Sequence, residues 1–363
     1  MNPPQLVQAV DASPIRKGES LNASKKALQD TFGRRVSYLR LSVTDRCDFR
    51  CVYCMAEDMT FLPRKEVLTL EEMSLLSQAF IELGTKKIRV TGGEPLIRRG
   101  IVALCSNLTS IDGLEELCIT TNGSKLGTLA APLKEAGVKR INVSLDTLED
   151  HRFKHITRFG ELNDVLNGID TAVKCGFDRI KINAVLMQNY NLHEAAHLAR
   201  YAVEQGCDIS FIEEMPLGDI TSHARDAEFI SSEDVRELLS KDFTFIEQSS
   251  IHDEHAGPTR YWNIEGYDGR IGFISPHSEN FCESCNRVRV TASGRLLLCL
   301  GNEHSVDLRA CLRDESLMNV SQREKLDRLK NTIIDAMQIK PEKHEFNLQE
   351  EPQILRFMNT TGG

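Results

Sequence analysis

Residues 37–54, SYLRLSVTDRCDFRCVYC, place a predicted β-strand (37–43) just before three cysteines, Cys47, Cys51 and Cys54. Iron–sulfur clusters are held by cysteine thiolates, and a cubane normally takes four of them. Three closely spaced thiols after a strand therefore indicate a cluster with one iron left open for a small ligand. A zinc knuckle or three unrelated buried thiols are the alternatives, but three cysteines within eight residues are rarely a coincidence.

Composition and charge limit the class of protein. The 363 residues suffice for one large α/β domain with an appendage, or for two domains. No apolar run reaches the roughly 18 residues that a membrane span needs, and the N-terminus lacks the apolar core of a signal peptide. Eleven cysteines without a secretion signal indicate a reducing compartment, the cytoplasm, where clustered cysteines usually bind metal. The net charge of −9 argues against a nucleic-acid partner, so any anionic ligand must meet basic residues gathered in one cavity.

Strand and helix patterns alternate from residue 36 to about 215. Apolar spacing predicts strands at 37–43, 87–91, 116–120, 139–145, 179–186 and 209–213. It predicts helices near 70–83, 100–109, 126–136, 162–175 and 193–205, with a capping box formed by Thr69 and Glu72. This alternation predicts a parallel sheet with right-handed crossovers. Six units are too few for an eight-fold barrel, so we expect a partial (β/α)6 barrel resembling a TIM barrel, with a doubly wound open sheet as the alternative.

The pattern changes after Met215-Pro216. Short runs at 261–265 and 270–274 flank Asp268-Gly269, and runs at 288–291 and 296–299 flank Ser293-Gly294. Both arrangements predict antiparallel hairpins. A charged helix is predicted near 321–337. We therefore expect three parts: a flexible extension (1–30) that becomes ordered only near Phe32, the partial barrel (31–216), and a smaller α+β segment (217–363) that covers the open side.

Several residues are predicted at the mouth of this barrel, where parallel strands end. Gly92-Gly93-Glu94-Pro95 follows the second strand; its glycines allow close backbone approach, and Glu94 can accept hydrogen bonds from an ammonium group. Ser144 ends the fourth strand and Met215 follows the sixth, so both are suited to contact a nucleoside, although either side chain could simply pack. A tight strand-to-helix turn is the alternative reading of the glycine motif.

Basic residues lie on the predicted core strands, namely Arg40, Lys87, Arg89 and Lys181. Charged residues are unusual there unless they are paired or bind a ligand. Charge-assisted hydrogen bonds contribute roughly 1.5–3 kcal/mol each, so three or four could hold a polyphosphate. Ion pairs at the strand ends remain the alternative for any one of them.

A second group of thiols, Cys282, Cys285 and Cys299, belongs to the second hairpin. It again offers three ligands, which favours another cluster with an open iron facing the first. A structural zinc site would need a fourth ligand, for which His277 and His304 are candidates. Arg287 and Arg289 alternate just after Cys285 and could bind phosphate beside it.

One further motif, His193-Glu194-Ala195-Ala196-His197, fits the zinc-protease pattern H-E-x-x-H. It opens the helix that follows the fifth strand, where amphipathic packing explains it. No third ligand is evident and the cysteines would have no role, so we expect no protease site.

The cysteine triads and GGEP together resemble the GTP 3′,8-cyclase family of radical S-adenosylmethionine enzymes, which open molybdenum-cofactor biosynthesis. The resemblance runs from about Phe32 to the final Gly-Gly and is carried by LRLSVTDRCDFRCVYCM, IRVTGGEPLIRR, TTNG, RINVSLDTL and FCESCNRVRVTASGRLLLCL. It implies two [4Fe–4S] clusters. One is held by Cys47, Cys51 and Cys54 and binds S-adenosylmethionine; the other, auxiliary cluster is held by Cys282, Cys285 and Cys299 and binds guanine.

The resemblance also implies ligand contacts and a reaction. S-adenosylmethionine would contact Tyr53, Gly93, Ser144 and Met215, and GTP would contact Arg40, Arg89, Thr120, Lys181, Arg287, Val288 and Arg289. The 5′-deoxyadenosyl radical would abstract the ribose 3′ hydrogen, and the carbon radical would attack guanine C8 to give (8S)-3′,8-cyclo-7,8-dihydroguanosine 5′-triphosphate. Gly362 and Gly363 would reach into the active site. Implied partners are a flavodoxin- or ferredoxin-type donor, the downstream cyclic pyranopterin monophosphate synthase and a second copy of the chain.

Two positions depart from the family pattern. Ser210 stands where arginine is expected, which puts one phosphate contact in doubt, and Gly100 replaces an acidic or amide residue at a helix cap. Two other functions remain open at this point. One is a different radical S-adenosylmethionine enzyme, such as one that modifies a peptide, and the other is a non-enzymatic module that binds zinc or senses redox state.

Overall fold

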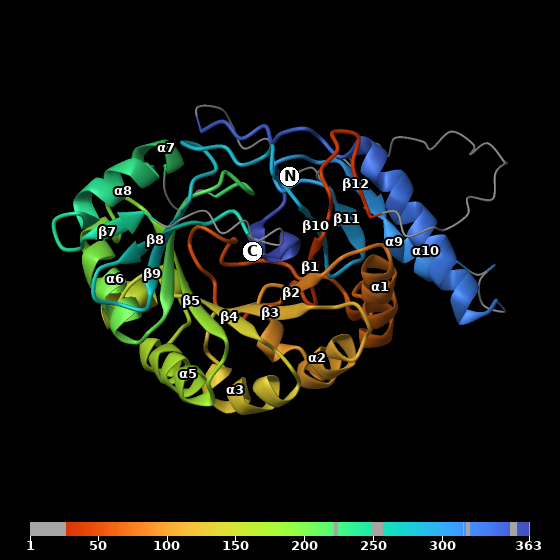
Figure 1. Ribbon diagram of the computed structural model, residues 1–363, viewed down its shortest axis with the longest axis horizontal. Coiled ribbons are helices and arrows are strands. Elements are labelled where there is room, and N and C mark those ends of the chain that lie inside the picture. The colour runs from red at the N-terminus through yellow and green to blue at the C-terminus, as the bar shows by residue number, and fades with distance from the viewer. Residues whose placement is uncertain are drawn as a thin grey trace.

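A twelve-stranded sheet organises the chain in a computed structural model that describes residues 27–220, 224–247, 257–314, 316, 320–348 and 354–362. Its middle is six parallel strands in sequential order, β1 (Tyr38–Ser42), β2 (Lys87–Thr91), β3 (Glu116–Thr121), β4 (Arg140–Ser144), β5 (Arg179–Leu186) and β6 (Asp208–Glu213). Sequential order without a reversal puts every crossover on one face. The strands therefore curve into the predicted partial barrel with the helices outside (Figure 1), and the doubly wound alternative is wrong.

The helices of the barrel bury one face each against the strands. They are α1 (Leu70–Glu82), α2 (Ile101–Thr109), α3 (Leu126–Glu135), α4 (Asp150–Thr157), α5 (Leu162–Cys175) and α6 (Ala195–Glu204), with short 3₁₀ turns η1 (Arg64–Glu66), η2 (Pro95–Ile97) and η3 (Leu192–Glu194). On α1 the buried residues include Met73, Leu76 and Phe80, spaced by three and four. The predicted capping box is confirmed, since Thr69 and Glu72 each accept the other's backbone N–H.

The C-terminal part extends the sheet at both edges. The strands β10 (Arg287–Val290), β11 (Arg295–Leu297) and β12 (Ser305–Asp307) continue it beyond β1, and β9 (Arg270–Ile274), β8 (Arg260–Ile264) and β7 (Phe245–Glu247) continue it beyond β6. The two predicted hairpins are β8–β9 and β10–β11, both antiparallel. β10 and β9 join the barrel in parallel with β1 and β6, so the α+β segment narrows the open side.

The remaining helices are α7 (Arg225–Glu228), α8 (Ser232–Leu239), α9 (Leu308–Leu312), α10 (Gln322–Ala336), η5 (Met337–Ile339) and α11 (Met358–Thr361). Figure 1 shows α10 on the outside near α1 and the C-terminal end near the centre of the barrel. None of the described helices has the length and apolar character needed to cross a membrane. The division at residue 216 stays a prediction, because a single sheet runs through both parts.

The start of the chain is ordered earlier than Phe32. Leu28 is buried, donates its N–H to Leu83 O at 2.9 Å and accepts from the Val36 N–H at 2.8 Å. Most of the predicted flexible extension, residues 1–26, lies outside the described residues, as does Gly363.

Candidate active site

The first thiol loop is fixed in place by the glycine turn after β2. The Gly93 N–H donates to Thr44 O and the Glu94 N–H donates to Arg46 O, both at 2.8 Å. A Cβ on Gly93 would lie 2.4 Å from Arg46 O, so only glycine allows this approach. The turn therefore holds the residue immediately before Cys47.

Glu94 has a structural role within the protein, while its expected contact with an ammonium group stays a prediction. Its Oε1 accepts from the Leu96 N–H at 2.8 Å and from Thr121 Oγ1 at 2.7 Å, and its Oε2 accepts from the Asn122 N–H at 2.6 Å. The side chain is fully buried, and burial raises its pKa to about 7. Three of about four acceptor positions are thus occupied by the protein, which ties the turn to the end of β3.

The three thiols of the loop fit an iron–sulfur cluster better than a single ion. Burial raises the pKa of Cys54 to about 12 and those of Cys47 and Cys51 at least as strongly, so thiolates there require bound cations. Ligands of one tetrahedral zinc would lie roughly 3.8 Å apart. Within the described ranges, one group of three potential metal ligands has its ligand atoms within 4.8 Å of one another, and it consists of Glu149, His193 and Glu194. The sulfurs of each cysteine triad therefore lie too far apart to bind one zinc ion together.

Tyr53 and Asp146 connect this loop to the opposite strands. The Tyr53 hydroxyl donates to Asp146 Oδ2 at 2.7 Å, and Asp146 Oδ1 accepts from the Val185 N–H at 2.8 Å. Burial raises the pKa of Asp146 to about 6. Ser144 ends β4, two residues before Asp146, and is half-buried in register with Asn183. Sequence reasoning did not identify Asp146, because its partner lies 93 positions away.

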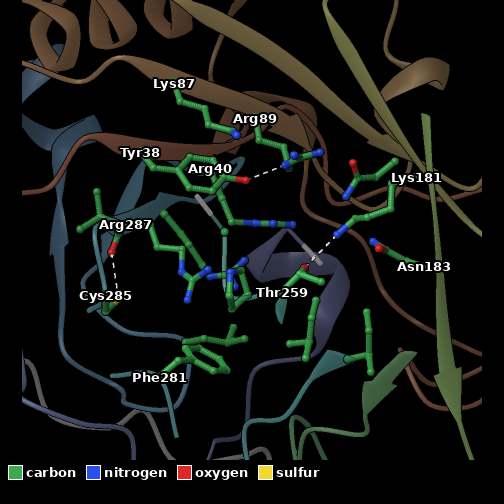
Figure 2. A pocket seen from close by; sticks show the side chains of 18 of the residues that line it. Tyr38, Arg40, Lys87, Arg89, Lys181, Asn183, Thr259, Phe281, Cys285 and Arg287 are labelled. Atoms are coloured by element: carbon green, nitrogen blue, oxygen red, sulfur yellow. Dashed lines mark hydrogen bonds between the residues drawn. The ribbon is translucent and has the colours of Figure 1, made fainter. Parts of the chain in front are cut away.

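A cavity of about 1090 Å³ lies inside the barrel, and both parts of the chain line it. Figure 2 shows Arg40, Arg89, Lys181 and Arg287 around one space, with Cys285 at its edge. The predicted residues that line the cavity are Arg40, Lys87, Arg89, Lys181, Met215, Cys282, Cys285, Arg287, Val288, Arg289 and Cys299. The predicted residues outside this lining are Cys47, Cys51, Tyr53, Cys54, Gly93, Thr120, Ser144 and Gly362. The chamber is therefore cationic and shares a wall with the second triad.

The C-terminal segment links the first triad to this chamber. The Met358 N–H donates to Cys54 O at 3.3 Å, and Met358 also lines the cavity. At the end of α11, Gly362 O accepts from Arg40 Nη2 and from Arg289 Nη1, both at 3.0 Å. Gly362 thus lies beside two of the predicted GTP-binding arginines, and its part in the active site stays a prediction.

Two cations on β2 have different partners. Lys87 Nζ lies 2.7 Å from a Glu116 carboxylate oxygen, so for this residue the ion-pair interpretation holds. Arg89 Nε donates to the Tyr38 hydroxyl at 2.6 Å, and its Nη1 lies 3.4 Å from Thr120 Oγ1. Burial raises the pKa of Tyr38, but Arg89 and other cations outweigh it and lower that pKa to about 8. Tyr38 escaped notice, although it lies two residues before Arg40 on the same strand face.

Lys181 enters the cavity from β5. Its Nζ donates to Thr259 Oγ1 at 3.1 Å and lies 5.8 Å from the centre of the Tyr261 ring (Figure 2). Burial and the charge of Arg89 lower its pKa well below the ordinary value, which means that a bound anion would stabilise its ammonium form. Ser210 is fully buried on β6 and does not belong to the lining residues, so the doubt about a phosphate contact there stands.

The second triad has a more positive environment than the first. Burial raises the pKa of Cys285, but Arg287 and Lys340 outweigh it and lower that pKa to about 7. Neither candidate zinc ligand joins the cysteines in a convergent set among the described residues. The Nε2 atom of His277 instead lies 2.9 Å from Glu214 O. The three sulfurs thus fit a second cluster rather than a closed zinc site.

The H-E-x-x-H motif has a structural explanation. Glu194 accepts from Thr147 Oγ1 at 2.6 Å and from the Leu148 N–H at 2.9 Å, and it pairs with Arg152 at 2.5 Å. It brings His193 near Glu149, but His197 does not belong to that group. The carboxylate of Glu194 therefore holds the loop after β4 in place. Gly100 also has a local reason, since its φ is +84° at the start of α2.

Comparisons with known proteins identify the class of enzyme. Residues 41–202 match the family model of the Radical SAM superfamily, and residues 207–346 match that of Molybdenum Cofactor Synthesis C. The structure of Streptococcus suis SuiB bound to S-adenosylmethionine has a TM-score of 0.52 at 15% identity, over 91% of this chain and 78% of that one, which supports the fold alone. Fold and thiol loop together define a radical S-adenosylmethionine enzyme.

Individual relatives identify the family more narrowly. A GTP 3′,8-cyclase of Saccharophagus degradans is 64% identical over 93% of this chain and 98% of its own length. One of Pseudomonas fluorescens is 57% identical over 94% of this chain and 100% of its own length. The chain therefore belongs to the GTP 3′,8-cyclase family. This membership favours neither a peptide-modifying enzyme nor a zinc or redox module.

Proposed function

We propose that the chain converts GTP to 3′,8-cyclo-7,8-dihydroguanosine 5′-triphosphate, the first step of molybdenum-cofactor biosynthesis. The observation that carries this proposal is the shared chamber. Arg40, Lys181 and Arg289 line it together with the sulfur of Cys285, so a triphosphate and a ring bound at an iron would fit in one cavity. The net charge of the chain is −9, so the attraction of the nucleotide must come from a local cluster of cations such as this one.

The residues divide into three groups in this proposal. Cys47, Cys51 and Cys54 hold the first cluster, and Tyr53, Gly93, Ser144 and Met215 surround S-adenosylmethionine. Cys282, Cys285 and Cys299 hold the auxiliary cluster. Bound cluster and S-adenosylmethionine supply hydrogen-abstraction chemistry that protein side chains lack. The protein positions the substrate. The triphosphate is oriented by Arg40, Arg89, Lys181, Arg287 and Arg289, and Thr120 and Val288 lie beside them. The helix α11 excludes water from the site.

The test is an anaerobic assay with S-adenosylmethionine, reductant and GTP carrying deuterium at the ribose 3′ carbon. We expect deuterium in 5′-deoxyadenosine and a cyclised guanosine triphosphate in equal amounts. ATP labelled in the same way is the control and should transfer none. Deuterium-free 5′-deoxyadenosine together with unchanged GTP would contradict the proposal, and a labelled peptide product would favour the alternative enzyme class.

The partners follow from the reaction. We propose a low-potential flavodoxin- or ferredoxin-type donor, because each turnover must begin with a one-electron reduction. We also propose that cyclic pyranopterin monophosphate synthase takes the product, that the chain forms a homodimer, and that it works in the cytoplasm. None of the described cysteines forms a disulfide, which is consistent with a reducing compartment. Sedimentation of the iron-loaded chain tests the dimer.

A further inference from the structure

Lys340 is a buried cation with no conventional counter-ion. It follows η5 directly and is 3% exposed. Its Nζ donates to Leu298 O at 3.0 Å and lies 3.7 Å from Cys285 Sγ. Among the described residues, no carboxylate lies within ion-pair distance of it. Lysine is almost never fully buried unless its charge is paired, and among the described residues the Cys285 sulfur is the nearby group that can carry a negative charge.

The position of Lys340 is held by contacts to the same thiol turn. Arg34 Nη1 donates to Cys282 O at 2.8 Å and to Glu342 O at 2.6 Å, while its Nη2 donates to Pro341 O at 2.7 Å. Arg34 is itself fixed by Asp30 at 2.6 Å. The residues that follow Lys340 are thus fastened to the turn that begins the second triad. A chance approach of a flexible lysine would not come with this support.

In the described part of the chain, no lysine or arginine is recorded in a hydrogen bond to a sulfur of the first triad. The hydrogen bonds described for its sulfurs come from neutral groups, the Phe49 N–H at 3.4 Å and Asn122 Nδ2 at 3.8 Å, both to Cys47. The two triads therefore offer the same number of thiolates but differ in charge around them. Reduction potentials of iron–sulfur clusters respond to nearby charge and to hydrogen bonds on the sulfurs.

We propose that Lys340 is a positioning residue for the auxiliary cluster, where it pairs with the Cys285 thiolate and raises the cluster's reduction potential. The inference rests on the proposed function, because it requires Cys282, Cys285 and Cys299 to hold that cluster. One-electron reduction makes a cluster more negative, and a fixed ammonium group stabilises the reduced form more than the oxidised one. The auxiliary cluster would then stay easier to reduce than its ligand set alone provides.

The experiment uses the full chain with Cys47, Cys51 and Cys54 all replaced by alanine, so that only the auxiliary cluster forms. Lys340→Met removes the charge and keeps most of the volume. Lys340→Arg is the conservative variant, and Lys343→Met removes an exposed charge three residues on. Each variant is titrated with dithionite and redox mediators, and the reduced cluster is measured by electron paramagnetic resonance.

We expect Lys340→Met to lower the reduced-to-oxidised ratio at a fixed potential about tenfold, equivalent to about 59 mV for one electron. Lys340→Arg and Lys343→Met should stay close to the parent. An unchanged ratio in Lys340→Met at full iron content would overturn the inference. If Lys340→Met loses its iron and Lys340→Arg keeps it, the charge pairing is supported; loss in both variants overturns it. A parent without roughly four irons per chain would instead refute the proposed cluster site, and the inference with it.

Discussion

Replacing Gly362 with alanine tests whether the C-terminal segment orders the active site. Gly362 has a φ of +75°, and a Cβ there would lie 2.2 Å from Thr91 Oγ1. The left-handed conformation alone costs an L-residue about 1–2 kcal/mol. Thr91 is buried on β2 and cannot move away, so the contact adds to this cost. A penalty of that size lowers the equilibrium constant for insertion of the segment by about 5–30-fold before the clash is counted.

The loss should appear in catalysis rather than in folding. Without Gly362 O, Arg40 and Arg289 each lose a hydrogen-bond acceptor at 3.0 Å that helps to orient them. We therefore expect Gly362→Ala to reduce turnover of GTP by at least 5–30-fold, while the thermal midpoint stays within a few degrees of the parent. Hydrogen exchange should be faster at the Met358 amide, which donates to Cys54 O in the inserted state.

The matched control is Gly266→Ala. Gly266 has a φ of +82°, but a Cβ there would meet nothing within 4 Å, so this variant carries the backbone strain without the clash. It should turn over GTP like the parent. The reasoning is refuted if Gly362→Ala retains full turnover and full protection of Met358, or if Gly266→Ala loses as much activity.

Three further predictions concern the thiols, the chamber and the barrel. Cys54→Ala should form no 5′-deoxyadenosine and keep only about half of the iron, as measured by product chromatography and metal analysis. Arg289→Met should weaken GTP binding roughly 10- to 150-fold in equilibrium dialysis, the equivalent of one charge-assisted hydrogen bond, and unchanged affinity would remove it from the site. Burial raises the pKa of Glu116, but Lys87 and Arg140 outweigh this effect and lower that pKa to about 2. The stability that this ion pair contributes above pH 4.5 should be lost as the pH falls towards 2, and denaturant titrations should show a flatter profile for Glu116→Gln; parallel profiles would contradict this.

Periodic patterns made the fold predictable, since they depend on neighbours in sequence. The six barrel strands follow alternating or continuous apolar runs that end in polar or glycine residues, and both hairpins surround glycine turns. The helix α4 was missed because its sequence, DHRFKHIT, is mostly polar and buries few side chains. The strand β12 was missed because three residues carry no period.

The site was less predictable than the fold, because many of its contacts join residues that are far apart in the sequence. The cysteine triads were recognisable because their members are close in sequence. Lys87 looked like a phosphate ligand until β3 placed Glu116 beside it. The structural partners of Glu94 could not be predicted, because Thr121 and the Asn122 N–H are donors 27 and 28 positions away. Lys340 gave no signal, since a single lysine after a helix is ordinary until its burial beside Cys285 is seen.

The acidic chain can bind a polyanion because its carboxylates around the barrel are neutralised locally. Asp208, fully buried, is held by Arg270 Nη2 at 2.6 Å, and Glu116 by Lys87. The cations deeper in the chamber repel one another instead: burial and the charges of Arg40 and Arg287 hold the pKa of Arg289 well below its ordinary range. A neutral carbonyl, Gly362 O, is what the structure places between Arg40 and Arg289. A bound triphosphate would relieve that repulsion. The affinity for the triphosphate therefore arises from the positive charge concentrated in the chamber and does not require a positive net charge on the whole protein.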